Sequence, residues 1–181
     1  MGKLKIKSTT ILGVRKKNKI ALGGDGQVTF GDMALKQKAV KVRQFETARG
    51  NILGGFAGAA ADAMTLFEKF EQKLDEYEGD LKRSVVELAK DWRTDKYLRH
   101  LDALLALMDK KSSFIVSGDG NVIEPDGPIV AIGSGGGFAQ AAATALLNST
   151  SKTALEIVHE SLKIASELCI YTNDSIMVME G

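Results

Sequence analysis

Cysteine and histidine are almost absent from this chain, and their scarcity removes several classes of site. The 181 residues contain one cysteine, Cys169, and two histidines, His100 and His159. A single cysteine excludes an internal disulfide and a cysteine-cluster metal site, and it suits a reducing compartment. Both histidines lie in charged stretches typical of a solvated helix surface, whereas Cys169 lies between apolar neighbours. A Ser-His-Asp or Cys-His catalytic site is therefore disfavoured.

The chain also lacks an excess of charge and long apolar runs. Lys plus Arg total 24 and Asp plus Glu total 23, so electrostatics gives no reason to expect nucleic acid or an anionic membrane as partner. Apolar stretches such as residues 11–14 and 129–132 fall well short of the roughly 20 residues that cross a bilayer. The first is also too short for a signal peptide. We expect a soluble, cytoplasmic protein.

A nucleotide-binding motif is missing as well. The glycine-rich stretch 133–137 follows an apolar segment and precedes a helical one, as phosphate-binding loops do. It lacks the Gly-Lys-Ser/Thr ending of a P-loop, and Phe138 stands where a dinucleotide fingerprint has its third glycine. We therefore expect this chain to bind no nucleotide, so any ATP hydrolysis would come from another protein.

The chain does contain alternating groups of strand and helix patterns. β-branched and apolar runs bounded by Gly, Asn and Asp predict strands, and apolar residues spaced by three and four predict helices. The expected strands are residues 9–14, 20–22, 28–30, 40–45, 51–56, 103–108, 113–117, 122–124, 129–132 and 175–179. The first expected helix runs from Gly58 to about residue 79, and the second begins at the cap Asp80, with its periodicity resuming at Leu98 and Leu101. The third covers residues 138–147, and the fourth begins at the capping box of Thr153.

This order limits the architecture. Two stacked sheets between two helical layers bury every apolar stripe at once. We therefore predict an α+β, four-layer αββα sandwich of two antiparallel sheets flanked by helix pairs. A two-layer α+β arrangement is the alternative that the pattern leaves open. Residues 9–181 form the one expected domain, preceded by a basic leader over residues 1–8.

Hydroxyl chemistry without histidine is the remaining catalytic option, and two threonines after the leader suit it. A hydroxyl nucleophile needs a base, and a chain's own α-amine, with an unperturbed pKa of about 7.7 to 8.0, can act as one. That requires a threonine at a free N-terminus, and the chemistry would accept Thr9 or Thr10. The same Thr-Thr-Ile-Leu sequence is also an ordinary beginning of a strand.

Further motifs accompany this pair in a familiar order. They are Thr9-Thr10-Ile11, Gly24-Asp25-Gly26-Gln27, Lys41-Val42-Arg43, Gly55-Phe56-Ala57-Gly58, Ala61-Asp62-Ala63, the stretch 87–95, Ala131-Ile132-Gly133-Ser134-Gly135-Gly136 and Cys169-Ile170-Tyr171-Thr172-Asn173. With them the chain resembles the HslV (ClpQ) family, the proteolytic subunits of bacterial ATP-dependent proteases related to proteasome β-subunits. The resemblance runs from Thr9 to near the C-terminus. It implies the N-terminal-nucleophile (Ntn) hydrolase fold and a threonine endopeptidase.

The resemblance implies a catalytic role for five residues. Removal of the leader would expose Thr9, whose hydroxyl attacks the peptide carbonyl while its α-amine takes the proton. Lys41 would place a positive charge close to the hydroxyl, and Asp25 would hold Lys41 charged and in position. Ser134 would hydrogen-bond the α-amine, and the Gly58 N–H would stabilise the oxyanion. Without the resemblance, Asp25 and Ser134 suit turns, and Gly58 suits close packing.

The resemblance also implies a cation and partners. Backbone carbonyls of Ser166, Cys169 and Thr172 would bind a sodium ion at the C-terminal end of the last helix, where the helix dipole favours a cation. The family assembles as two stacked six-membered rings, capped by an HslU-type AAA+ ATPase that unfolds protein substrates. The alternative function is a non-catalytic ring subunit that kept the fold as a scaffold.

Overall fold

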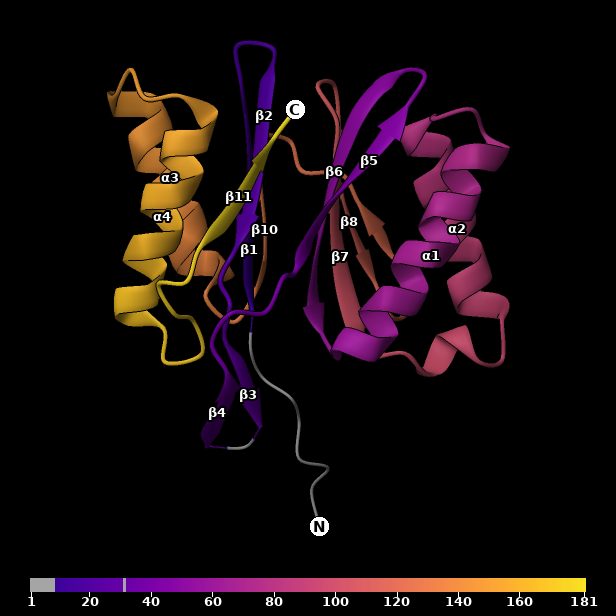
Figure 1. The fold of residues 1–181 in the computed structure, drawn as a ribbon. Helices are drawn as coiled ribbons and strands as arrows, with labels where there is room; N and C mark the ends of the chain where they lie inside the picture. The colour runs from indigo at the N-terminus through magenta and orange to yellow at the C-terminus, as the bar shows by residue number, and fades with distance from the viewer. Residues whose placement is uncertain (1–8, 31) are drawn as a thin grey trace.

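The computed structural model describes residues 9–30 and 32–181, which stack in four layers (Figure 1). The first half of the chain contains β1 (Thr10–Lys16), β2 (Lys19–Gly24), β3 (Val28–Phe30), β4 (Met33–Lys36), β5 (Val42–Thr47), β6 (Gly50–Gly58), α1 (Ala60–Glu76) and α2 (Leu81–Thr94). The second half contains a short 3₁₀ helix η1 (Leu98–His100), β7 (Ala103–Met108), β8 (Ser113–Ser117), β9 (Val122–Ile123), β10 (Ile129–Gly133), α3 (Gly136–Ser149), α4 (Ala154–Leu168) and β11 (Met177–Glu180). The predicted leader, residues 1–8, lies outside the described residues.

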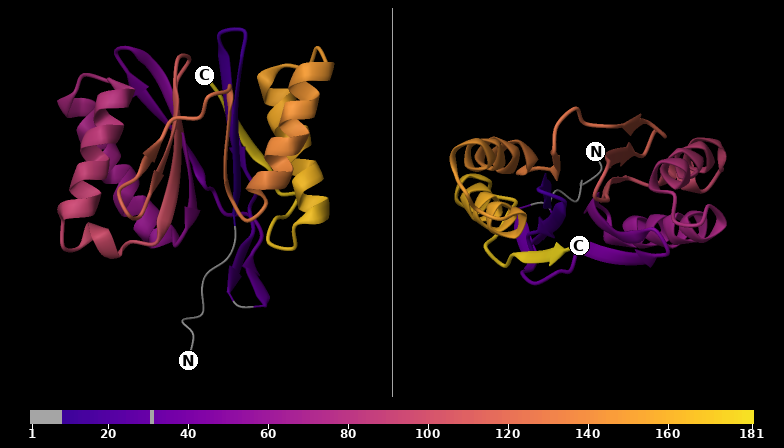
Figure 2. Two further views of the ribbon diagram at one scale, coloured as in Figure 1. Left: turned by 180° about the vertical axis from the view of Figure 1, so that it is seen from behind. Right: turned by 90° about the horizontal axis from the view of Figure 1, so that it is seen from above.

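Two antiparallel sheets form the inner layers. One has the strand order β10-β1-β2-β11 and the other has the order β5-β6-β7-β8-β9. Helices α3 and α4 cover the outer face of the first sheet, and α1 and α2 cover that of the second; the view from above in Figure 2 shows the layers end on. The predicted αββα sandwich is confirmed, and the two-layer alternative is wrong.

The apolar runs of the strands are continuous because both faces of each sheet are buried. In β7, Leu105 and Leu107 pack in the core beneath α1 and α2, while Ala106 and Met108 pack in the core between the sheets. Successive side chains of a strand point to opposite faces. A sheet enclosed on both sides therefore replaces the usual apolar–polar alternation with an unbroken apolar run.

Helix ends follow the local capping chemistry. The Asp80 side chain accepts a hydrogen bond from the Arg83 N–H at the start of α2, and Thr153 and Glu156 form the predicted capping box of α4. The periodicity expected to resume at Leu98 belongs to a separate element, the 3₁₀ helix η1: α2 ends at Thr94, and Asp95 accepts from two N–H groups of the next turn. Within the described residues, no helix is both long and apolar enough to span a membrane.

One strand was not anticipated from the sequence. β4 pairs with β3 in a separate two-stranded ribbon that projects beyond the two sheets (Figure 1). All four residues of β4 are exposed, so its sequence carries no buried face that would mark it as a strand. The remaining strands agree with their predicted ranges to within two residues at either end.

Candidate active site

The strand register brings Asp25 and Ser134 to either side of the start of β1. Ile11 pairs with Gly24 on β2, and Thr10 pairs with Gly133 on β10. Each neighbouring strand therefore carries its next functional residue to the sheet edge where β1 begins. The Ser134 N–H donates to the Thr9 carbonyl at 2.9 Å. Three predicted site residues that are far apart in the sequence thus meet at one edge.

Asp25 is the centre of a buried hydrogen-bond network. Its Oδ1 accepts from the Thr10 N–H at 2.8 Å, and its Oδ2 accepts from the Gln27 N–H at 2.9 Å and the Asn173 N–H at 3.3 Å. Its own N–H donates to the Thr10 carbonyl at 3.2 Å. The carboxylate is 1% exposed, so these donors replace the water that an ionised carboxylate would otherwise require.

Lys41 reaches the same carboxylate from the other sheet. It directly precedes β5, and its Nζ lies 3.1 Å from Asp25 Oδ1 and donates to the Gln27 carbonyl at 2.5 Å. The Lys41 side chain is 2% exposed. Burial lowers the pKa of the Lys41 ammonium below 10.5, and the adjacent Asp25 charge partly opposes that decrease. The pair is therefore a charged link between the two sheets.

The two threonines differ in the direction of their side chains. In β1, Ile11 packs in the core between the sheets, and Leu12 packs beneath α3 and α4. Thr10 lies on the helix side, where its hydroxyl accepts from the Gly135 N–H. Thr9 directly precedes β1, and strand alternation predicts the opposite side for it, toward the second sheet. The sequence left both threonines open as nucleophile. The Thr10 hydroxyl is buried and bonded to Gly135 and Thr172, which favours Thr9 as the candidate.

Thr9 and Gly133 have unusual backbone conformations at this edge. Thr9 has a φ of 152°, a value that a β-branched residue rarely adopts. Gly133 has a φ of 90°, and a Cβ there would overlap the Thr9 carbonyl oxygen. Only glycine allows the turn after β10 to approach the start of β1 so closely. Ser134, which follows, is exposed at this edge.

Gly58 ends β6 at the same end of the sandwich. A Cβ at Gly55 would meet the side chain of Ile11, so β6 crosses close to β1 between the sheets. β6 runs toward the edge where β1 begins, since Val42 pairs with Gly55 immediately after Lys41. The helix α1 that follows has Ala59 as its N-cap, without a side-chain cap. Its first N–H groups therefore suit an anionic oxygen.

The predicted sodium ligands lie at the C-terminal end of α4, with Ser166 in its last turn, Cys169 as its C-cap and Thr172 in the turn that follows. The Cys169 N–H donates to the Ala165 carbonyl, and the Cys169 carbonyl accepts from the Thr172 N–H at 3.0 Å. In the described part of the chain, no backbone hydrogen bond is directed to the Ser166 or Thr172 carbonyl. Carbonyl oxygens with free lone pairs at a helix C-terminus are ligands that a hard cation accepts, so these residues fit the ion.

Sequence reasoning missed three contributors to this network: Gln27, the hydroxyl of Thr10 and the hydroxyl of Thr172. The Gln27 side chain is buried and donates from Nε2 to Thr29 Oγ1 and to the Ile170 carbonyl. In the sequence, Gln27 stands out only as the last residue of the Gly-Asp-Gly-Gln motif. One of its partners, Ile170, is 143 positions away, so local sequence gave no signal for that contact.

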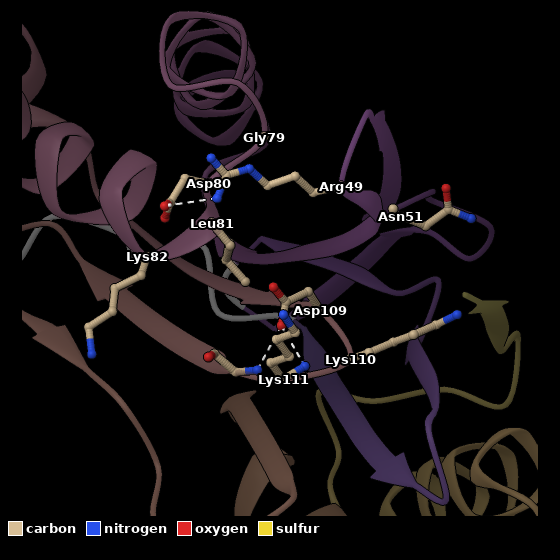
Figure 3. A pocket seen from close by; sticks show the side chains of 11 residues that line it. Arg49, Asn51, Gly79, Asp80, Leu81, Lys82, Asp109, Lys110 and Lys111 are labelled. Atoms are coloured by element: carbon tan, nitrogen blue, oxygen red, sulfur yellow. Dashed lines mark hydrogen bonds and ion pairs between the residues drawn. The ribbon is translucent and has the colours of Figure 1, made fainter.

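A surface pocket lies at the other end of the sandwich. It has a volume of about 250 Å³ and is lined by the turn between β5 and β6, the start of α2 and the turn between β7 and β8. Figure 3 shows Arg49 paired with Asp80 across it, at 3.2 Å, and Lys82 and Lys110 extending in opposite directions. Its basic side chains do not converge, so we assign no catalytic role to it.

Comparison with known proteins places this geometry in a class. The chain belongs to the proteasome subunit family, because the model of that family, described as "Proteasome subunit", matches residues 6–180. A solved structure of Thiobacillus denitrificans BPH in complex with epoxomicin has a TM-score of 0.73 at 19% identity, covering 95% of this chain and 97% of that one. At that identity the similarity concerns the fold alone.

Within the family, the sequence is similar to HslV. It is 53% identical over 177 residues to the ATP-dependent protease subunit HslV of Aquifex aeolicus (strain VF5), covering 98% of this chain and 99% of the relative. The crystal structure of eukaryotic HslV from Trypanosoma brucei matches with a TM-score of 0.87 at 42% identity, covering 94% of this chain and 98% of that one. The family resemblance drawn from the motifs is therefore confirmed.

Proposed function

We propose that this chain is a threonine endopeptidase, the proteolytic subunit of a two-component ATP-dependent protease. The observation that carries the proposal is the buried Asp25–Lys41 pair, which links the two sheets beside the start of β1. Burying two charges is costly, and their position next to a threonine gives the pair a catalytic use. The 53% identity to a protein named an ATP-dependent protease subunit supports the same function.

The geometry supports a mechanism in which Thr9 supplies both nucleophile and base. After loss of residues 1–8, the neutral α-amine of Thr9 takes the hydroxyl proton, and Oγ attacks the peptide carbonyl. The Lys41 charge favours the deprotonated hydroxyl, and the Gly58 N–H stabilises the oxyanion. The proton passes to the leaving amine, which leaves an ester on Thr9. Water, activated by the same amine, then hydrolyses the ester and regenerates the hydroxyl.

Ser134 completes the proposed site. It adjoins Thr9 through the hydrogen bond from its N–H to the Thr9 carbonyl. Its side chain is exposed, and in the proposed mechanism it hydrogen-bonds the α-amine once the leader is gone. Such a bond would orient the lone pair of the amine toward the Thr9 hydroxyl, which general-base catalysis requires.

The substitution Thr9→Ala tests the nucleophile. We expect it to remove peptide hydrolysis while leaving the folded chain intact, because Ala keeps the strand but supplies no hydroxyl. Intact-mass measurement of the wild-type protein should show the loss of residues 1–8. The matched control is Thr94→Ala, an exposed threonine on α2. Full hydrolysis by Thr9→Ala, or by a protein that retains the leader, contradicts the mechanism.

The partners and the cation form the rest of the proposal. The chain forms two stacked six-membered rings in the cytoplasm, and an HslU-type ATPase delivers unfolded proteins to them. A sodium ion bound by the carbonyls of Ser166, Cys169 and Thr172 would supply a fixed positive charge at the turn after α4. The second candidate, a non-catalytic scaffold, predicts that the wild-type chain hydrolyses no peptide with or without the ATPase.

A further inference from the structure

A cluster of two buried hydroxyls lies next to the proposed catalytic site, on the face of the first sheet that α3 and α4 cover. Thr10 Oγ1 and Thr172 Oγ1 are 2.7 Å apart, and the Gly135 N–H donates to Thr10 Oγ1 at 3.0 Å. Thr10 is 0% exposed and Thr172 is 4% exposed. The contact therefore joins the first residue of β1 to the turn after α4, without access to water.

The cluster is closely packed at Gly135. A Cβ at this position would overlap Thr10 Oγ1 and lie 2.7 Å from Thr172 Oγ1. Three segments consequently meet here: the start of β1, the start of α3 and the C-terminal turn. Only glycine leaves room at this position for both hydroxyls.

The residue after Thr172 contacts the catalytic carboxylate. The Asn173 N–H donates to Asp25 Oδ2 at 3.3 Å, and the Asn173 Oδ1 accepts from the Gly26 N–H at 3.0 Å. Its Nδ2 donates to the carbonyl and to the side chain of Gln37, at 2.9 and 2.8 Å. The C-terminal turn thus holds both Thr10 and Asp25, which are the two direct neighbours of the reacting residues.

We propose that Thr172 is a positioning residue for the Thr9 nucleophile, a role that rests on the proposed function. Thr10 is held at its N–H and its carbonyl by Asp25 and at its hydroxyl by Thr172 and Gly135. Thr9 is covalently attached to Thr10, so the fixed position of Thr10 sets where the Thr9 hydroxyl and amine lie relative to Lys41. Thr172 touches neither the substrate nor the reacting atoms.

Loss of the Thr172 hydroxyl should reduce turnover more than substrate affinity. The Thr10 hydroxyl would lose a buried partner, and the start of β1 would be free to shift toward another one. A misplacement of about 1 Å can cost about 100-fold in rate. For Thr172→Val we expect kcat to fall by roughly tenfold or more, with KM changed by less than about twofold, because the strand shift moves the nucleophile rather than the peptide-binding surface.

Two substitutions separate positioning from packing. Thr172→Val keeps both branches of the side chain but loses the hydroxyl, whereas Thr172→Ser keeps the hydroxyl but loses the methyl group. The exposed Thr94→Val is the matched control. Positioning predicts that Ser restores kcat to within about threefold of wild type and Val does not. A packing role predicts the reverse order, and that result, or equal kcat for Val and wild type, overturns the proposal.

Hydrogen exchange supplies a readout that does not depend on activity. In Thr172→Val, the peptide that contains residues 10–16 should exchange its amides faster than in wild type, while in Thr172→Ser it should not. If wild-type protein hydrolyses no peptide, the proposed function fails, yet this comparison still decides whether Thr172 holds the start of β1. Unchanged exchange in Thr172→Val overturns the positioning role.

Discussion

At the scale of single residues, Lys41 shows how burial and charge are balanced in this site. Its side chain is almost fully enclosed, and one carboxylate and one carbonyl replace its water shell. Loss of one partner from a buried pair typically costs about 3–5 kcal/mol, because the other charge is left uncompensated. The pair is thus weak evidence for stability but strong evidence that a charge is needed at this position.

The pH dependence of hydrolysis follows from the two groups that titrate. The α-amine must be neutral to act as base, so activity should rise with pH through a value of about 7.7 to 8.0. The folded-state pKa of Lys41 is lowered from 10.5. As the pH rises through that lowered pKa, Lys41 loses its charge, so activity should fall again at a pH below 10.5. The measurement is the pH profile of kcat/KM, for which we expect a bell.

The substitution Asp25→Asn tests whether Lys41 causes the fall in activity at alkaline pH. Asp25 raises the pKa of Lys41 against the effect of burial, so its neutral replacement should lower that pKa further and move the alkaline limb to lower pH. Conditions should include a check that the variant is folded across the range. If the alkaline limb of the kcat/KM profile does not move, the titration of Lys41 is not its cause.

Some residues of the proposed site could be predicted from the sequence, and others could not. Asp25, Lys41 and Ser134 could be selected as candidates because their motifs stand in order in one chain. The Thr10–Thr172 contact could not, because it joins residues 162 positions apart and each threonine alone suits a strand or a turn. Hydroxyl pairing depends on which side chains the folded backbone brings within about 3 Å.

At the scale of elements, α4 serves two purposes with its two ends. Its N-terminus is closed by the Thr153–Glu156 capping box, which satisfies two backbone donors. Its C-terminus leads into the turn with Cys169 and Thr172; among the described residues, the Cys169 carbonyl accepts one backbone hydrogen bond, and the Ser166 and Thr172 carbonyls accept none. The helix dipole places negative partial charge at that end, and the turn that follows contacts Asp25 through the Asn173 N–H.

A cation at this turn should stabilise the protein, and the effect should grow with the logarithm of the cation concentration above the dissociation constant. We expect the melting temperature to rise when sodium replaces tetramethylammonium at constant ionic strength, because only the smaller ion fits carbonyl ligands. A concentration about tenfold above the dissociation constant corresponds to roughly 1.4 kcal/mol. Ser166→Ala is the control, since the ligand is a backbone carbonyl and the sodium effect should persist. Equal stability in both salts contradicts the site.

The ribbon of β3 and β4 contains the one described strand, β4, that the sequence did not predict. Met33 and Leu35 are 67% and 62% exposed, although both are large and apolar. A two-stranded ribbon is marginal by itself, but its base is fastened where the Asn173 side chain donates to Gln37 and the Ala39 N–H donates to the Gly26 carbonyl. Tertiary contacts at the base, rather than a local apolar pattern, keep this strand pair in place.

At the scale of the whole molecule, the proposed site exists only where the two sheets meet. The first sheet contributes the start of β1 and the Asp25 turn, and the second contributes Lys41 and the end of β6. Relative movement of the sheets would separate Lys41 from Asp25. The packing of Ile11, Leu22, Val42 and Leu53 between the sheets therefore fixes the distance on which the charged pair depends.

The proposed assembly gives a prediction at this scale. Native mass spectrometry should find a species of twelve chains, because the proposed assembly consists of two six-membered rings. Thr9→Ala should assemble equally, since the hydroxyl belongs to the chemistry rather than to the packing. A monomer at working concentration in both proteins would contradict the ring, while leaving the single-chain geometry of Asp25 and Lys41 as it is.

The sequence by itself determined the class of fold, because apolar periodicity and turn residues are local properties and their order allows few ways to bury every apolar face. It also supplied the candidates Thr9, Asp25, Lys41 and Ser134. Only the tertiary structure showed that the Thr10 hydroxyl is engaged on the helix side, which favours Thr9 as the nucleophile, and that the turn at Thr172 contacts the first strand. The reason is physical: the face of a strand and a contact between distant segments are set by register and packing, which no local stretch of sequence encodes.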